Sequence, residues 1–125
     1  MELDKILVNV NYLEGSDVNS DGSIKSSVNK GKPVLLMMQS NYCPHCTNAK
    51  PAFQKLANDM GNTVCVATIQ TDGGPSDLAA AKALKNVNTS RGVPAYLVFD
   101  KQGRFIKMHE GGRDYNSLVQ VMSGM

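Results

Sequence analysis

The order of apolar segments is the feature that most restricts how this chain can fold. Residues 33–39 and 63–69 are apolar runs without polar alternation, which is typical of strands covered on both faces of a sheet. Between them, apolar residues recur at helical spacing over residues 43–60, and Gly61 supplies a natural helix end. Because helical crossovers join parallel strands, these segments predict a parallel pair of strands at the centre of the protein.

The remaining segments continue the alternation of strands and helices. We expect a first strand over residues 5–10, a short helical piece before Gly31, an alanine-rich helix over residues 78–85 capped by Ser76 or Asp77, strands over residues 95–100 and 104–110, and a last helix from about Asp114. A tight turn makes the last two strands an antiparallel hairpin. We therefore predict an α/β fold in which residues 1–125 form a single domain, with a mixed central β-sheet flanked by α-helices.

Composition argues against several classes of partner. Charged residues make up 19% of the chain and the formal net charge is only +2, so nothing predicts a surface for nucleic acid or for an anionic membrane. No apolar run approaches the ~20 residues of a membrane span. The N-terminal residues lack the basic, apolar and small-residue order of a signal peptide. We therefore expect a cytoplasmic monomer that binds neither nucleic acid nor membranes.

Cys43 and Cys46 form a C-P-H-C motif at the predicted start of a helix. A sulfur in the first turn faces unpaired backbone N–H groups and the positive end of the helix dipole, which favour the thiolate over the thiol. Cys46 follows about one turn later on the same side of the helix, within disulfide reach of Cys43. The motif predicts thiol–disulfide exchange in which Cys43 attacks a substrate and Cys46 resolves the mixed disulfide.

The two residues between the cysteines indicate a direction for this exchange. Pro44 suits the first helical turn, which does not need the N–H group that proline lacks. His45 can place an imidazole near the Cys43 sulfur and stabilise its thiolate. Stabilising the thiolate makes the disulfide form less stable relative to the reduced form. We therefore expect an oxidase or isomerase rather than a reductase.

Three further features resemble the thioredoxin family. Pro51 lies eight residues after Cys43, residues 91–103 resemble the thioredoxin segment that carries a cis-proline, and residues 110–113 (EGGR) stand where thioredoxins have a glycine turn before the last helix. The resemblance spans about residues 30–123. It implies a thioredoxin-like domain that acts on protein dithiols or disulfides, is recycled by an unidentified redox partner and uses no cofactor. The C-P-H-C motif is similar to that of bacterial periplasmic disulfide oxidases.

The resemblance also implies a substrate-binding surface. It consists of Gly92, Val93 and Pro94, with the Val93–Pro94 bond cis and the Val93 backbone free to pair with a substrate strand. Tyr42 stands where thioredoxins have a tryptophan, next to the attacking cysteine.

Two positions depart from the thioredoxin pattern. The family usually has a buried aspartate six residues before the first cysteine and a lysine near it on the neighbouring strand, and these places hold Met37 and Thr68. The usual proton acceptor for the second thiol is therefore absent. Cys46 would have to lose its proton to water or to another group.

Other interpretations of the cysteines stay open. A structural disulfide is a poor explanation because so short a loop restrains little chain entropy. A zinc site needs four ligands, and besides the motif the chain offers Cys65, which we expect to be buried in a strand, and His109. A dimer that shares zinc or an iron–sulfur cluster through two such motifs, and a redox-inactive module that uses the fold to bind a partner protein, remain as alternatives. We expect no metal.

Residues 17–22 also match the start of a calcium-binding loop. However, Val28 stands where a bidentate glutamate is required. A polar turn is the better interpretation of this segment.

Overall fold

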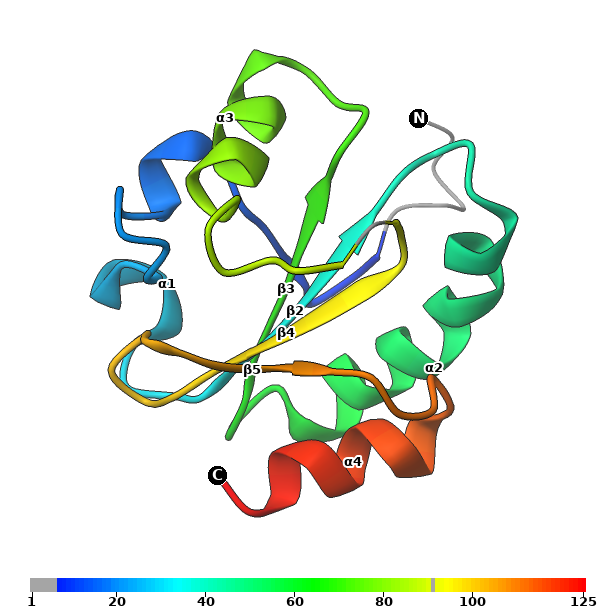
Figure 1. Cartoon of the computed structure of the whole chain (residues 1–125). Coiled ribbons are helices and arrows are strands. Elements are labelled where there is room, and N and C mark those ends of the chain that lie inside the picture. Colours follow the sequence, from blue (N-terminus) through cyan, green and yellow to red (C-terminus); the bar gives the residue numbers. More distant parts are fainter. Residues whose placement is uncertain (1–6, 91) are drawn as a thin grey trace.

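The computed structural model describes residues 7–90 and 92–125, and within these ranges five strands form one sheet with helices on both faces (Figure 1). The sheet order is β1-β3-β2-β4-β5, in which β1, β3 and β2 run parallel and β4 is antiparallel to both β2 and β5. The elements are β1 (Asn11–Tyr12), η2 (Gly15–Asp17), α1 (Ser26–Asn29), β2 (Val34–Gln39), α2 (Pro44–Met60), β3 (Cys65–Gln70), α3 (Pro75–Ala83), β4 (Ala95–Phe99), β5 (Phe105–His109) and α4 (Tyr115–Ser123). The predicted α/β fold with a mixed sheet is confirmed.

The first strand differs from the prediction. It covers only Asn11–Tyr12, parallel to β3, whereas residues 7–10 are not in a strand and residues 5 and 6 lie outside the described ranges. Asn9 has a positive φ of 60°, which interrupts an extended conformation. Instead of pairing with the sheet, the Val8 backbone exchanges hydrogen bonds with the side chain of Gln54 on α2. The apolar pattern of residues 5–10 was therefore a poor guide to where pairing begins.

The helix starts show where capping rules succeed and fail. The last helix begins near Asp114 as predicted, and Asp114 is its N-cap, since its carboxylate accepts the Ser117 backbone N–H. The predicted cap of α3 is wrong: the N-cap is Gly74, and Pro75 is the first helical residue, where its fixed φ suits the helix. Asp77 acts from inside the first turn by accepting the Gly74 N–H at 3.0 Å. None of the described helices is long and apolar enough to cross a membrane.

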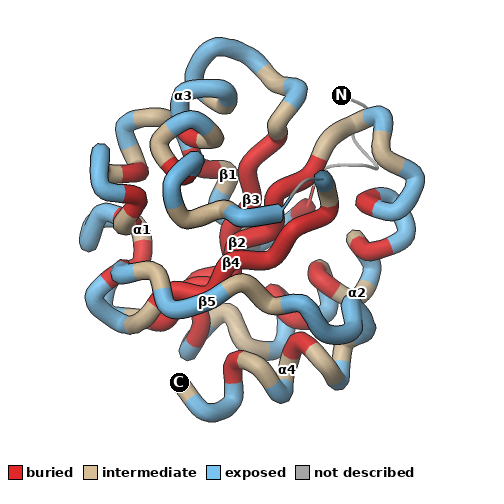
Figure 2. The backbone as a smooth tube through the Cα atoms, viewed as in Figure 1, coloured by how far each residue is buried: buried red, intermediate tan, exposed pale blue. Residues whose placement is uncertain are grey.

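The core lies in two layers, one on each face of the sheet. Leu36 and Met38 of β2 point towards α1 and α3, while Leu35 and Met37 point towards α2 and α4, as the two-residue period of a strand requires. Figure 2 shows the central strands fully buried and β5 partly exposed at the edge. A continuous apolar run thus marks a central strand, as the sequence indicated.

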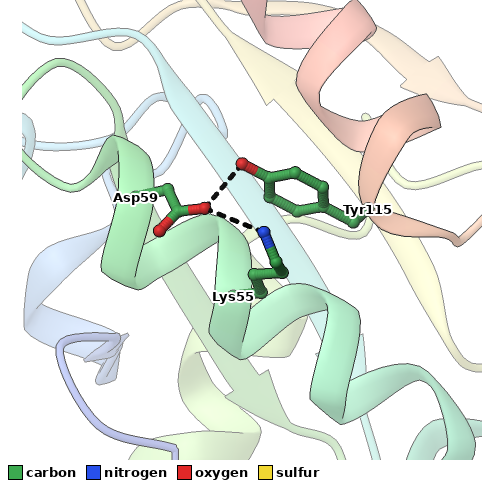
Figure 3. A network of polar contacts seen from close by, with 3 residues as sticks. All are labelled: Lys55, Asp59 and Tyr115. Atoms are coloured by element: carbon green, nitrogen blue, oxygen red, sulfur yellow. Dashed lines mark hydrogen bonds and ion pairs between the residues drawn. The ribbon is translucent and has the colours of Figure 1, made fainter.

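A small polar network joins α2 to α4 on the outer surface (Figure 3). The carboxylate of Asp59 accepts hydrogen bonds from Lys55 on its own helix, at 3.2 Å, and from the Tyr115 hydroxyl of α4, at 2.6 Å. The Lys55 ammonium also lies 3.8 Å from the centre of the Tyr115 ring. These contacts help to fix α4 against the helix that carries the C-P-H-C motif.

Candidate active site

Cys43 is the N-cap of α2, and its half-buried sulfur faces the start of the helix. The backbone N–H of Cys46 donates to the Cys43 sulfur at 3.1 Å, and Pro44 occupies the first helical position. Hydrogen-bond donors and the helix dipole at this end stabilise negative charge on an acceptor. Cys43 therefore occupies the position that the motif predicted, with an accessible sulfur and a backbone donor directed at it.

Cys46 lies one turn further along α2 and is fully buried. Burial, and to a smaller extent the hydrogen bond with Cys43, raise the pKa of the Cys46 thiol to about 12. Both cysteines are free thiols in the structure. The two sulfurs therefore differ: one is accessible at a helix N-terminus, and the other is a buried thiol that keeps its proton at neutral pH.

The loop before β4 lies against the accessible sulfur. The Cys43 thiol donates to the Val93 carbonyl at 3.4 Å, and the Val93–Pro94 peptide bond is cis. Gly92 is exposed beside them, with space where a side chain would stand. The structure thus brings the predicted substrate-binding residues Gly92, Val93 and Pro94 together with Cys43.

His45 and Tyr42 are exposed on either side of Cys43 in the sequence. The Tyr42 side chain is 91% exposed, which leaves a large aromatic surface next to the active sulfur. His45 borders a shallow surface pocket with Arg113 and Asp114, at the start of α4. His45 is thus an exposed residue of the first turn of α2.

Met37 and Thr68 are paired directly across β2 and β3 in the interior of the sheet. The Thr68 hydroxyl donates to the Met37 carbonyl at 2.7 Å and accepts from the Gln39 side-chain amide at 2.7 Å. Neither side chain carries an acid or a base. The two positions that the resemblance assigns to an aspartate and a lysine therefore hold no proton acceptor for Cys46.

Two functional candidates were missed from the sequence. Asp72, just after β3, accepts the backbone N–H of Asn41 with both carboxylate oxygens, at 2.9 and 3.2 Å, and so fixes the loop that leads into Cys43. Tyr96 lies opposite Met37 on β4, buried and with its hydroxyl unpaired. A signal existed for Asp72, since polar residues that follow neighbouring parallel strands meet at one edge of a sheet.

Cys65 lies away from the motif, whereas His109 lies at the same end of the sheet as Pro94. Cys65 is the first residue of β3, buried at the opposite end of the parallel strands, and His109 ends the edge strand β5. The His109 ring contacts the Gly112 carbonyl through Nε2 at 2.8 Å. Within residues 7–90 and 92–125, no group of three or more histidine, cysteine or acidic side chains is arranged to hold a metal ion.

Comparison with known proteins agrees with this geometry. The family model described as Thioredoxin matches residues 16–124. A putative thioredoxin-like protein of Invertebrate iridescent virus 6 is 31% identical, in an alignment that covers 92% of this chain and 93% of that protein. Protein disulfide-isomerase 1 of Dictyostelium discoideum is 26% identical over 113 residues, covering 90% of this chain and 30% of that protein.

A solved structure shows the same architecture. The exposed lipoprotein thioredoxin Etrx1 of Streptococcus pneumoniae superposes with a TM-score of 0.67, covering 86% of this chain and 96% of that one. At 21% sequence identity, this similarity shows the common fold alone. The match of the family model over residues 16–124 and the identity to the viral relative establish that this chain belongs to the thioredoxin family.

Proposed function

We propose that this protein is a thiol–disulfide oxidoreductase in which Cys43 attacks protein substrates and Cys46 resolves the mixed disulfide. Family membership and the similarity to a protein disulfide-isomerase support a role of this type. The observation that carries the assignment is the asymmetry of the two thiols. The Cys43 sulfur is accessible and accepts a backbone N–H at 3.1 Å, whereas Cys46 is buried directly behind it.

The first step forms a bond between the protein and its substrate. The Cys43 thiolate attacks one sulfur of a substrate disulfide, and the S–S bond of the substrate breaks as the new S–S bond forms. One substrate thiolate leaves and takes a proton from solvent. The N–H group of Cys46 stabilises the attacking thiolate at the start of the helix.

The second step releases the substrate. Cys46 loses its proton, and its thiolate attacks the Cys43 sulfur, so that a Cys43–Cys46 disulfide forms and the remaining substrate thiolate leaves. Two electrons pass from the cysteine pair to the substrate. Run in reverse, the same steps transfer the disulfide from the protein to a substrate dithiol.

His45 is the residue that we expect to set the preferred direction. Its exposed imidazole stands in the first turn of α2, between the two cysteines in the sequence, where a positive charge favours the Cys43 thiolate. A stabilised thiolate favours the reduced cysteine pair over its disulfide, so the disulfide form is readily reduced and is a strong oxidant of other thiols. We therefore propose that the protein acts as an oxidase or isomerase rather than as a reductase.

The substrate is proposed to bind across Cys43. An extended segment that carries a cysteine can pair with the backbone at Val93 and displace the Cys43 thiol from the Val93 carbonyl. Tyr42, almost fully exposed, offers an apolar contact for the residues beside that cysteine. These contacts depend on backbone and general apolar surface, which favours a broad range of unfolded or extended protein substrates.

Two activity assays test the proposal. The reduced protein should reduce insulin disulfides, and the oxidised protein should restore activity to reduced ribonuclease. Cys43→Ser should lower both rates by at least ~100-fold because it removes the attacking thiolate. Cys46→Ser should accumulate mixed disulfides at Cys43, visible on non-reducing gels, because the resolving thiol is gone.

The same assays can contradict the proposal. Equal rates for the wild type and Cys43→Ser, with substrate proteins still bound, would favour a redox-inactive binding module. Zinc or an iron–sulfur cluster held between two chains, and lost with Cys43→Ser, would favour the metal-bridged dimer instead.

A further inference from the structure

The resolving step needs a route by which the proton of a buried thiol reaches solvent. Burial raises the pKa of the Cys46 thiol to about 12, so at neutral pH the proton must be passed to another group before the sulfur can attack. Met37 has no ionisable group, and the Thr68 hydroxyl is already bonded as donor and acceptor. The Gln39 amide oxygen is buried and unpaired, but a neutral amide does not carry a proton away.

Tyr96 is a buried hydroxyl on the same face of the sheet as Cys46. It lies directly opposite Met37, and its ring packs against Phe53 of α2 with 6.1 Å between ring centres. Cys46, Ala49 and Phe53 form one buried stripe of α2. The Tyr96 side chain is only 2% exposed, and its hydroxyl has no hydrogen-bond partner among the described residues. An unpaired buried hydroxyl is unfavourable for folding unless water or a functional role accounts for it.

A pocket of about 180 Å³ at the surface near the end of β5 has Tyr96 in its lining. Its lining includes Pro94, Tyr96, His109, Glu110 and Arg113. This volume and polar lining are sufficient for several water molecules, each of which needs about 30 Å³. A hydrogen-bonded path from the buried hydroxyl to solvent can therefore run through this pocket.

His109 supplies a proton acceptor beside Tyr96. The two rings are in edge contact, with 6.1 Å between centres and 74° between planes. His109 Nε2 lies 2.8 Å from the Gly112 carbonyl, and because a carbonyl only accepts, Nε2 must carry the hydrogen. In the neutral ring, Nδ1 is then the nitrogen with a free lone pair.

We propose that Tyr96 relays the proton of Cys46, through water in this pocket, to His109 and solvent during the resolving step. This inference rests on the proposed function. The Tyr96 hydroxyl takes up the Cys46 proton through a water molecule as it gives its own proton to a water on the side of His109. No phenolate forms, His109 Nδ1 or bulk water holds the proton at the end, and the Cys46 thiolate is free to attack Cys43.

Electrostatic coupling agrees with this placement. Burial raises the pKa of Tyr96 to about 12, the Arg113 charge lowers it, and the Cys46 thiolate raises it. The hydroxyl consequently stays protonated at neutral pH and can donate and accept at once. The ionisable groups around Tyr96 are Cys46 of α2, His109 of β5, and Glu110 and Arg113 between β5 and α4.

Stopped-flow reaction with 5,5′-dithiobis(2-nitrobenzoate) tests the relay because it separates the two steps. Attack by Cys43 releases one equivalent of thionitrobenzoate, and resolution by Cys46 releases the second. At pH 7, Tyr96→Phe should slow the second phase at least tenfold and leave the first phase unchanged. Tyr115→Phe, which removes an exposed hydroxyl bound to Asp59, is the matched control and should leave both phases unchanged.

The pH profile distinguishes a relay from a packing effect. Without the hydroxyl, hydroxide from solvent must take the proton, so the second phase of Tyr96→Phe should rise about tenfold per pH unit and approach the wild-type rate at high pH. His109→Gln, which lacks a basic ring nitrogen, should slow the second phase severalfold and provides the test if Tyr96→Phe does not fold.

Two outcomes of the stopped-flow experiment would overturn the inference, and they are distinguishable. A wild-type protein with two phases, together with Tyr96→Phe and His109→Gln proteins that share its second-phase rate and pH profile, would exclude the relay but keep the proposed function. A wild-type protein in which Cys43 forms no mixed disulfide would overturn the proposed function and the relay with it.

Discussion

The two ends of the parallel strands each hold a buried thiol, and only one of them is placed for exchange chemistry. Cys46 lies beyond the carboxyl end of β2, and Cys65 is the first residue of β3 at the opposite end. Both are at least 95% buried, with exposed fractions of 0% and 5%, and burial raises the pKa of both thiols. Burial and a high pKa are therefore shared, and they cannot be what makes Cys46 a candidate for catalysis.

The difference lies in what surrounds each sulfur. Cys46 has Cys43 one turn away, at the start of a helix and only half-buried. The Cys65 sulfur instead contacts the Asn11 amide at 3.5 Å and the Val28 carbonyl at 3.8 Å, and its backbone N–H bonds the Pro33 carbonyl. A buried thiol becomes a resolving group only where an accessible sulfur stands beside it.

The opposite end also has a polar pocket, of about 340 Å³, lined by Asn29, Lys30, Lys32 and Cys65 among others. Lys30 and Lys32 lower the pKa of Cys65, but less than burial raises it. Nearby positive charge thus does not offset the loss of solvent around this sulfur. The comparison indicates that solvent access and a position at a helix N-terminus contribute more to the reactivity of a thiol than nearby lysines do.

Alkylation should show the largest difference between the two ends. In the reduced native protein, iodoacetamide at pH 7 should modify Cys43 at least ~100-fold faster than Cys65, because Cys65 must first be exposed by opening of the core. Mass spectrometry of timed digests measures each site. Cys65→Ala should leave insulin reduction unchanged. Rapid alkylation of Cys65, or loss of activity in Cys65→Ala, would break the proposed contrast between the two ends.

The redox potential should show an intermediate effect. His45→Pro removes the imidazole from the first turn of α2 and should make the Cys43–Cys46 disulfide harder to reduce, with a change of about tenfold in its equilibrium with glutathione. Asn48→Ala, one turn further along the exposed side of α2, is the matched control. An unchanged equilibrium in His45→Pro would remove the structural basis for an oxidase rather than a reductase.

Much of this arrangement could be predicted from residue order. The apolar runs located β2 and β3 to within two residues, because central strands are covered on both faces. The C-x-x-C spacing located the start of α2, and Cys43 is its N-cap. Counting from Cys43 placed Met37 and Thr68 together, and the two are paired across neighbouring strands. These successes rest on short-range patterns and on fixed strand register.

The features that were missed depend on backbone angles and side-chain contacts that a pattern of apolar residues does not encode. The first strand was placed too early because the positive φ of Asn9 cannot be read from an apolar pattern. The α3 cap was misassigned because Asp77 bonds back to Gly74 from within the helix. Tyr96 resembled any aromatic residue of a buried strand until its unpaired hydroxyl and its neighbour His109 were visible in three dimensions.

The pH dependence of stability should show the smallest effect of removing a buried thiol, because the contribution of the thiol to this dependence vanishes at neutral pH. The Cys46 thiol has a pKa of about 12 in the folded protein, above the value of 9.0 for an exposed thiol, so the folded state binds the proton more tightly. Its stabilising contribution is complete below about pH 9 and is lost as the pH rises towards 12. In that window the free energy of unfolding of the reduced protein should fall by up to ~1.4 kcal/mol per pH unit through this one proton.

Urea unfolding of the reduced wild type, Cys46→Ala and Cys65→Ala between pH 8 and 10.5 measures this slope. Each variant lacks one buried thiol, so each should have a shallower slope than the wild type, since burial raises the pKa of both thiols. Lysine and tyrosine titration is common to all three proteins and cancels in the difference. A Cys46→Ala slope equal to that of the wild type would mean that Cys46 ionises freely in the folded protein. In that case its proton would need no relay, and the two buried thiols would differ in acidity as well as in the presence of a neighbouring sulfur.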